Sequence, residues 1–148
     1  GVMSVFTEII AGNIPGRFVW ADDTCVAFGT HEPIKDGHTL VVPRREVSKF
    51  TDLDEATFAH LATVAQRIGR AQELAFGVPR AMLMIAGMEV PHVHLHVIPA
   101  TSEADIRFEN ARSGLPGEHM DAAVSKVRTA LEDLGFGEFV PANIHALG

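Results

Sequence analysis

Cysteine is nearly missing from this sequence. Cys25 is the only one among 148 residues, so the chain cannot form an internal disulfide, and a reducing compartment fits this composition. The chain also lacks an apolar run of about 20 residues, the length that a membrane-spanning helix needs. The basic start and apolar stretch of a signal peptide are missing as well. We therefore expect a cytoplasmic protein without a membrane segment.

Positive charge is scarce too. The chain has 12 Lys and Arg residues against 19 Asp and Glu residues, which gives a formal net charge of −7. A general nucleic-acid binder shows a basic face, so this function is not expected. An anionic small ligand is still compatible with the composition, because a few local hydrogen-bond donors can hold a phosphate in an acidic protein.

Linkers, internal repeats and low-complexity segments are also missing. Apolar residues make up 47% of the chain and charged residues 21%, as is usual for a globular protein. We therefore predict a single domain over residues 1–148, with most of its core in residues 4–100 and a C-terminal loop and helix in residues 101–148.

The spacing of apolar residues predicts alternating strands and helices. In chain order these are a helix at Val5–Ala11, strands at Arg17–Ala21, Cys25–Phe28 and His38–Pro43, a helix capped by Thr51 or Asp52 and ending near Phe76, strands at Ala81–Ala86 and around 92–98, and a helix over 118–134. This order indicates an α+β fold, with a mostly antiparallel sheet and helices packed on one face.

The long helix has the clearest pattern. Its apolar residues recur at steps of three and four, which places them on one buried stripe. The predicted stripe consists of Leu61, Val64, Ala65, Ile68, Ala71, Leu74 and Ala75.

The stretch PHVHLHVIP, residues 91–99, places three histidines at alternating positions. Successive side chains of a strand point to opposite faces, so His92, His94 and His96 are expected on one face. Val93, Leu95 and Val97 would then enter the core beneath them, and their burial would fix the register.

Three explanations of these histidines are open. A structural role requires a hydrogen-bond partner for each buried ring, which is hard to provide three times. A metal site requires further ligands, but His31, His38, His60, His119 and His145 form no second compact pair in the sequence. A phosphate site, with neutral imidazole as nucleophile and neighbouring rings as donors, is favoured, and His38 at the start of its strand is placed to complete it.

The run His92–Ile98 matches the signature His-φ-His-φ-His-φ-φ, with φ apolar, of the histidine triad (HIT) superfamily. Two further blocks resemble this family in the same order: VFTEIIAGNIPGRFVWADDTCVAF at 5–28 and GHTLVVPR at 37–44. The resemblance implies a five-stranded antiparallel sheet with two main helices, paired into a ten-stranded homodimer. It implies no cofactor.

The resemblance also implies an activity. HIT enzymes are nucleotidyl hydrolases or transferases that cleave at the α-phosphate of purine nucleotide conjugates, such as nucleoside phosphoramidates or dinucleoside polyphosphates, through a covalent nucleotidyl-histidine. Two alternatives stay open, a nucleotide-sensing or partner-binding module with weak turnover and a metal-dependent hydrolase.

Site residues follow from the same resemblance. His94 corresponds to the nucleophile, and His96, His92 and His38 would hold or polarise the phosphate oxygens. The nucleotide-binding positions are Val5, Phe6, Ile9, Phe28, Thr30, Gly87 and Glu89. The first four of these enclose the base, and Thr30 replaces an acidic or amide residue that holds the ribose. Glu89 replaces a hydroxyl residue near the leaving group, where it would donate a proton or repel an anionic group.

Zinc-binding members of the family carry Cys-x-x-Cys and a further histidine where this chain has Ser4, Thr7 and Glu46. The resemblance therefore implies that this chain has no zinc site and that His92 is available for the phosphate. We expect His60 and His119, on the two helices, to be solvated or packing residues.

Overall fold

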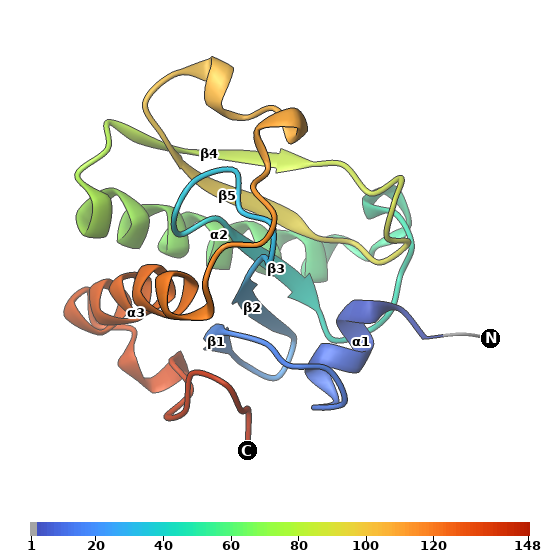
Figure 1. The fold of residues 1–148 in the computed structure, drawn as a ribbon. Helices are drawn as coiled ribbons and strands as arrows, with labels where there is room; N and C mark the ends of the chain where they lie inside the picture. Colours follow the sequence, from blue (N-terminus) through green and yellow to red (C-terminus); the bar gives the residue numbers. More distant parts are fainter. Residues whose placement is uncertain (1–2) are drawn as a thin grey trace.

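The computed structural model describes residues 3–148, and its elements follow the predicted order (Figure 1). The first two residues of the predicted domain lie outside the described residues. The main elements are α1 Val5–Ile10, β1 Phe18–Ala21, β2 Cys25–Gly29, β3 Thr39–Pro43, α2 Glu55–Phe76, β4 Arg80–Ile85, β5 Leu95–Ala100 and α3 Gly117–Asp133. Short 3-10 turns are η1 Phe50–Asp52, η2 Glu103–Asp105, η3 Phe108–Asn110 and η4 Gly137–Phe139.

The five strands form one antiparallel sheet in the order β1-β2-β3-β5-β4, which confirms the predicted α+β class. β5 lies between β3 and β4, so that His96 is flanked by Leu40 on one side and Met84 on the other. β4 is one of the two edge strands, with β1 at the other edge, and among the described residues it pairs only with β5.

Helices cover both faces of the sheet, so the expectation that they pack on one face is wrong for α1. α2 and α3 pack on the face that carries Val41, Leu95 and Val97. α1 packs on the opposite face, where Phe6 joins a smaller cluster around Phe28. A six-residue helix covers only part of this second face, and the cavity described below lies beside it.

The buried stripe of α2 differs from the prediction at Leu74 and at Gln72. Leu74 is 57% exposed, whereas Gln72 is fully buried. At 100° per residue, Leu74 lies about 220° around the helix from Leu61 and thus on the solvent side. Nε2 of Gln72 donates to the carbonyl oxygens of Gly37 and Val97 at 2.9 and 2.8 Å, whereas its buried Oε1 has no hydrogen-bond partner among the described residues.

The cap of α2 also lies further along the chain than predicted. Thr51 and Asp52 belong to the turn η1. The cap is Asp54, whose Oδ2 accepts a hydrogen bond from the Thr57 backbone amide at 3.0 Å. A carboxylate at this position satisfies a free amide and suits the positive end of the helix dipole.

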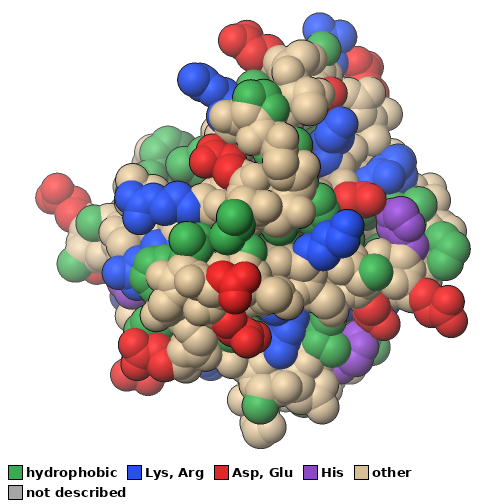
Figure 2. All heavy atoms as spheres, turned by 90° about the vertical axis from the view of Figure 1, so that its left-hand side faces the viewer, with side chains coloured by type: hydrophobic (Ala, Val, Ile, Leu, Met, Phe, Trp, Pro, Cys, Tyr) green, Lys and Arg blue, Asp and Glu red, His purple; other side chains and the backbone are tan. Residues whose placement is uncertain are grey.

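α3 belongs to the same core as α2. Its buried side chains are Ala123, Val124, Val127, Ala130 and Leu131. Within residues 3–148, no helix combines the length and apolar character needed to cross a membrane. Figure 2 shows one face of the molecule, on which acidic and basic side chains are interspersed.

Candidate active site

The histidine segment is only partly a strand. Val93, Leu95 and Val97 are buried as predicted, with at most 3% exposure. β5 begins at Leu95, however, so His96 is the only one of the three histidines within the strand. His92 and His94 lie in the segment just before it.

The strand begins late because its neighbour β3 ends in proline. Pro43 has no backbone N–H to donate, and its carbonyl oxygen accepts a hydrogen bond from the His92 ring at 2.8 Å. The Val93 amide donates instead to the carbonyl of Val47, at 2.8 Å. Pairing with β3 therefore begins only after His94, at Leu95. The rings of His94 and His96 still contact each other, with 4.9 Å between their centroids.

The backbone around His94 determines which of its ring nitrogens is free. Nδ1 lies 2.7 Å from the carbonyl oxygen of His92. A carbonyl can only accept, so Nδ1 carries the proton and Nε2 keeps a lone pair. Burial lowers the pKa of His94, although the bond to His92 opposes this effect. The ring is thus a neutral imidazole with a nucleophilic nitrogen.

His38 and His96 form a buried pair whose protons are also determined by the backbone. The Ile34 amide donates to Nδ1 of His38 at 3.0 Å, so the His38 proton is on Nε2. That nitrogen donates to Nδ1 of His96 at 2.9 Å. The remaining proton of His96 is therefore on Nε2, which is a hydrogen-bond donor next to His94.

Burial keeps this pair neutral. Burial, helped by the neighbouring histidines, lowers the pKa of His38 to about 3 and that of His96 to about 4. His38 has both ring nitrogens engaged, so it can polarise His96 but does not itself present a donor to a phosphate.

The predicted phosphate contact of His92 is wrong. Its ring is fully buried and does not line the cavity described below. Nδ1 lies 2.6 Å from the Ser4 hydroxyl, and Nε2 donates to the Pro43 carbonyl. With both nitrogens occupied, His92 positions its neighbours, and its own carbonyl orients His94.

A cavity of about 720 Å³ opens beside His94 and His96. Its walls include His38 and all seven predicted nucleotide-binding residues: Val5, Phe6, Ile9, Phe28, Thr30, Gly87 and Glu89. Phe6 packs edge-on against both Phe28 and His94, with centroids 5.6 and 4.8 Å apart. The apolar wall thus directly adjoins the histidines.

Sequence reasoning missed several residues of the wall. Arg17 lines the cavity, and its Nε donates to Asp121 on α3 at 2.6 Å. Phe108 comes from the irregular segment after β5 and meets His96 at 5.3 Å between ring centroids. Neither residue stands in a periodic pattern, and only the fold brings them to the site.

Comparison with known proteins agrees with this geometry. The sequence model of the HIT domain matches residues 11–103. An uncharacterized HIT-like protein of Saccharolobus solfataricus is 33% identical over 106 residues, which cover 68% of this chain and 76% of that protein. The chain belongs to the HIT family.

Solved HIT structures have the same fold. A zinc-bound histidine triad family protein from Mycobacterium smegmatis superposes with a TM-score of 0.76 at 28% identity, covering 88% of this chain and 94% of that one. A hypothetical histidine triad nucleotide-binding protein from Sulfolobus tokodaii gives 0.76 at 26% identity, covering 87% and 92%.

The positions that bind zinc in some HIT proteins do not fit zinc here. Structural zinc prefers thiolate and imidazole ligands, whereas these positions hold Ser4, Thr7 and Glu46 beside His92. The four side chains instead bond to one another. Glu46 Oε1 accepts from the Ser4 amide and the Thr7 hydroxyl, each at 2.7 Å, and Ser4 binds His92.

A different group of possible metal ligands lies at the turn between β1 and β2. Ligand atoms of Asp22, Cys25 and His60 lie within 4.8 Å of one another. The Asp22 carboxylate is already well satisfied, since it accepts from the Trp20 indole at 2.8 Å and lies 2.7 Å from His60 Nε2. Hydrogen bonding therefore accounts for this cluster, and His60 is a partner of Asp22 rather than a simply solvated residue.

Proposed function

We propose that this HIT protein is a nucleotidyl hydrolase that transfers a nucleoside monophosphate to His94 and then to water. The observation that carries the proposal is the opposed protonation of two adjacent rings. His94 offers a lone pair on Nε2, and His96 offers a proton on its Nε2, both at the cavity wall. A nucleophile beside a donor is what attack at an anionic phosphorus requires.

The reaction has two displacements. In the first, His94 Nε2 forms a bond to the α-phosphorus, the bond from phosphorus to the leaving group breaks, and the departing atom takes up a proton from water. In the second, water attacks phosphorus and gives its proton to the hydroxide that the first step left in the solvent, the P–N bond to His94 breaks, and the monophosphate leaves. His96 donates a hydrogen bond to a phosphoryl oxygen in both steps, and His38 keeps His96 in the required tautomer.

The charges around the cavity favour amine leaving groups over polyphosphates. Among the described residues, Arg17 is the only Lys or Arg of the wall, and Asp121 already pairs with it. Glu32 and Glu89 add negative charge to the same wall. Nucleoside phosphoramidates are therefore better substrates in our proposal than dinucleoside polyphosphates.

Substitution of His94 tests the covalent step. We expect His94→Ala to lower release of adenosine monophosphate from an adenosine phosphoramidate by about a thousandfold or more, while the nucleotide still binds. His60→Ala is the control, since His60 lies outside the cavity. In rapid quench with labelled substrate, the wild type should show a burst of protein-bound monophosphate. Saturable binding without a burst or turnover would instead favour a nucleotide sensor.

Glu89 tests the assignment of the leaving group. Glu89→Gln removes a negative charge at constant size, so we expect kcat/KM for diadenosine tetraphosphate to rise by about three- to tenfold. The value for a neutral alkyl phosphoramidate should change less. A wild type that prefers the polyphosphate would contradict the assignment.

A further inference from the structure

The segment between β5 and α3, residues 101–117, forms one wall of the cavity. It supplies Phe108 and Ala111 to the lining. The ring of Phe108 meets His96 edge-on at 5.3 Å between centroids, yet its side chain is 52% exposed. Half of an aromatic ring therefore stands open next to a residue of the proposed reaction, and a bound ligand would cover it.

Phe108 and Phe6 contact two different histidines of the site, His96 and His94. Phe6 packs on His94 and Phe108 packs on His96, while the two histidines contact each other. Phe6, together with Phe28, forms the wall that we assign to the base. A substrate with its base on that wall and its phosphorus between the two histidines would place its remaining group near Phe108.

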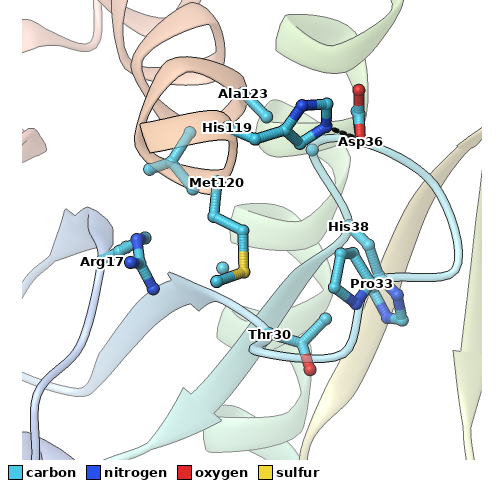
Figure 3. Close-up of a pocket in the computed structure, with 11 residues that line it drawn as sticks. Arg17, Thr30, Pro33, Asp36, His38, His119, Met120 and Ala123 are labelled. Atoms are coloured by element: carbon cyan, nitrogen blue, oxygen red, sulfur yellow. Dashed lines mark hydrogen bonds and ion pairs between the residues drawn. The ribbon is translucent and has the colours of Figure 1, made fainter. Parts of the chain in front are cut away.

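Hydrogen bonds hold this segment and the first turn of α3 against the loop that carries His38. Arg112 and His119 both donate to Oδ1 of Asp36 at 2.9 Å, and Figure 3 shows the bond from His119. The Arg112 backbone amide donates to the carbonyl of Pro33 at 3.2 Å. Burial raises the pKa of Asp36, but the bonds from His119 and Arg112 outweigh burial and lower it. The charged carboxylate therefore keeps the segment in place.

We infer that Phe108 is a specificity-determining residue, which binds aromatic or large apolar groups on the leaving amine. This inference rests on the proposed function and specifies its substrate class. Covering an exposed ring removes apolar surface from water, and aromatic groups gain further from edge-to-face or offset packing. A small alkyl amine can make neither contact.

Two adenosine phosphoramidates test the inference, one with 2-phenylethylamine as its leaving amine and one with ethylamine. We expect wild-type kcat/KM to favour the phenylethyl compound by about tenfold. Phe108→Ala should lower kcat/KM for the phenylethyl compound much more than for the ethyl compound and so remove most of this preference, whereas Phe108→Leu should keep part of it. Phe50→Ala is the matched control, because Phe50 is similarly exposed, at 44%, and lies outside the cavity.

Three outcomes would separate this inference from the proposed function. Equal losses for both substrates in Phe108→Ala would mean that Phe108 only supports His96, which would overturn the subsite. A wild type without preference would overturn it as well. If neither compound is turned over, the proposed function fails, but calorimetric binding of both compounds still decides the inference: a preference for the phenylethyl compound that Phe108→Ala removes supports it, and equal affinities overturn it.

Discussion

At the scale of single residues, the site depends on which nitrogen of each ring carries the proton. Two backbone groups decide this: the His92 carbonyl for His94 and the Ile34 amide for His38. Because the proton of His38 is on Nε2, this nitrogen donates to Nδ1 of His96 and so places the His96 proton on Nε2. No side-chain charge is needed to prepare the nucleophile, because the tautomers follow from the path of the chain.

The protonation of His94 gives a prediction for the pH dependence. His94 attacks only as neutral imidazole, and burial lowers its pKa from the ordinary value of 6.5. The His94 ring is therefore protonated, and loses its nucleophilic lone pair, at a lower pH than an exposed histidine would. We expect the acid limb of kcat/KM to have its inflection below pH 6.5, since kcat/KM reports groups of the free enzyme.

Two substrates with different leaving amines separate this effect from titration of the substrate. An inflection common to both belongs to the protein, whereas one that moves with the amine belongs to the compound. A shared inflection at or above pH 6.5 would show that His94 is not held neutral by burial.

At the scale of elements, α1 connects the base wall to the histidines. Ser4 caps this helix by accepting from the Thr7 amide at 3.1 Å, and the same hydroxyl binds His92. Val5, Phe6 and Ile9 of the helix line the cavity. One side chain thus determines where the helix begins and supports the residue that orients His94.

Ser4→Ala should therefore affect both stability and activity. We expect the free energy of unfolding to fall by about 1 kcal/mol, as for other lost helix caps. We also expect kcat/KM to fall about tenfold through displacement of the wall and of His94. Asp54→Ala is the control, since it removes the cap of α2 outside the cavity and should lower thermal stability without changing kcat/KM. Equal kinetic losses in the two variants would contradict a specific role of Ser4.

The order of elements could be predicted from the sequence because apolar spacing reports burial. Val93, Leu95 and Val97 alternate with the histidines, and all three are buried as expected. The residue at which β5 starts could not be predicted in the same way. It depends on the carbonyl of Pro43, which comes from a distant part of the chain and takes the His92 ring as its partner.

Other parts of the site were beyond sequence reasoning for a similar reason. Phe108 follows no helical or strand period, and its place beside His96 depends on contacts of the segment with Asp36 and Pro33. Gln72 is polar, so a stripe defined by apolar residues omits it, although its buried Nε2 donates to two carbonyl groups.

At the scale of the whole molecule, β4 lies at one edge of the sheet, where no strand within residues 3–148 pairs with its outer side. Edge strands of monomers usually carry charges or prolines that prevent further pairing. β4 has a charge only at Arg80, and its remaining residues, 81–85, read AMLMI. Leu83 is 53% exposed on this strand. These features favour a homodimer in which two β4 strands pair and join the sheets into ten strands.

An antiparallel pair of identical edge strands is self-complementary and closes with twofold symmetry. We therefore expect light scattering after gel filtration to give twice the chain mass of 16.0 kDa. Leu83→Glu should shift the protein to monomer, because two carboxylates would then face each other across the new strand pair. Leu134→Glu changes a residue with 39% exposure at the end of α3, a helix that contacts β1 at the opposite edge of the sheet, and should stay dimeric. A monomeric wild type, or dissociation by Leu134→Glu alone, would place the interface elsewhere or remove it.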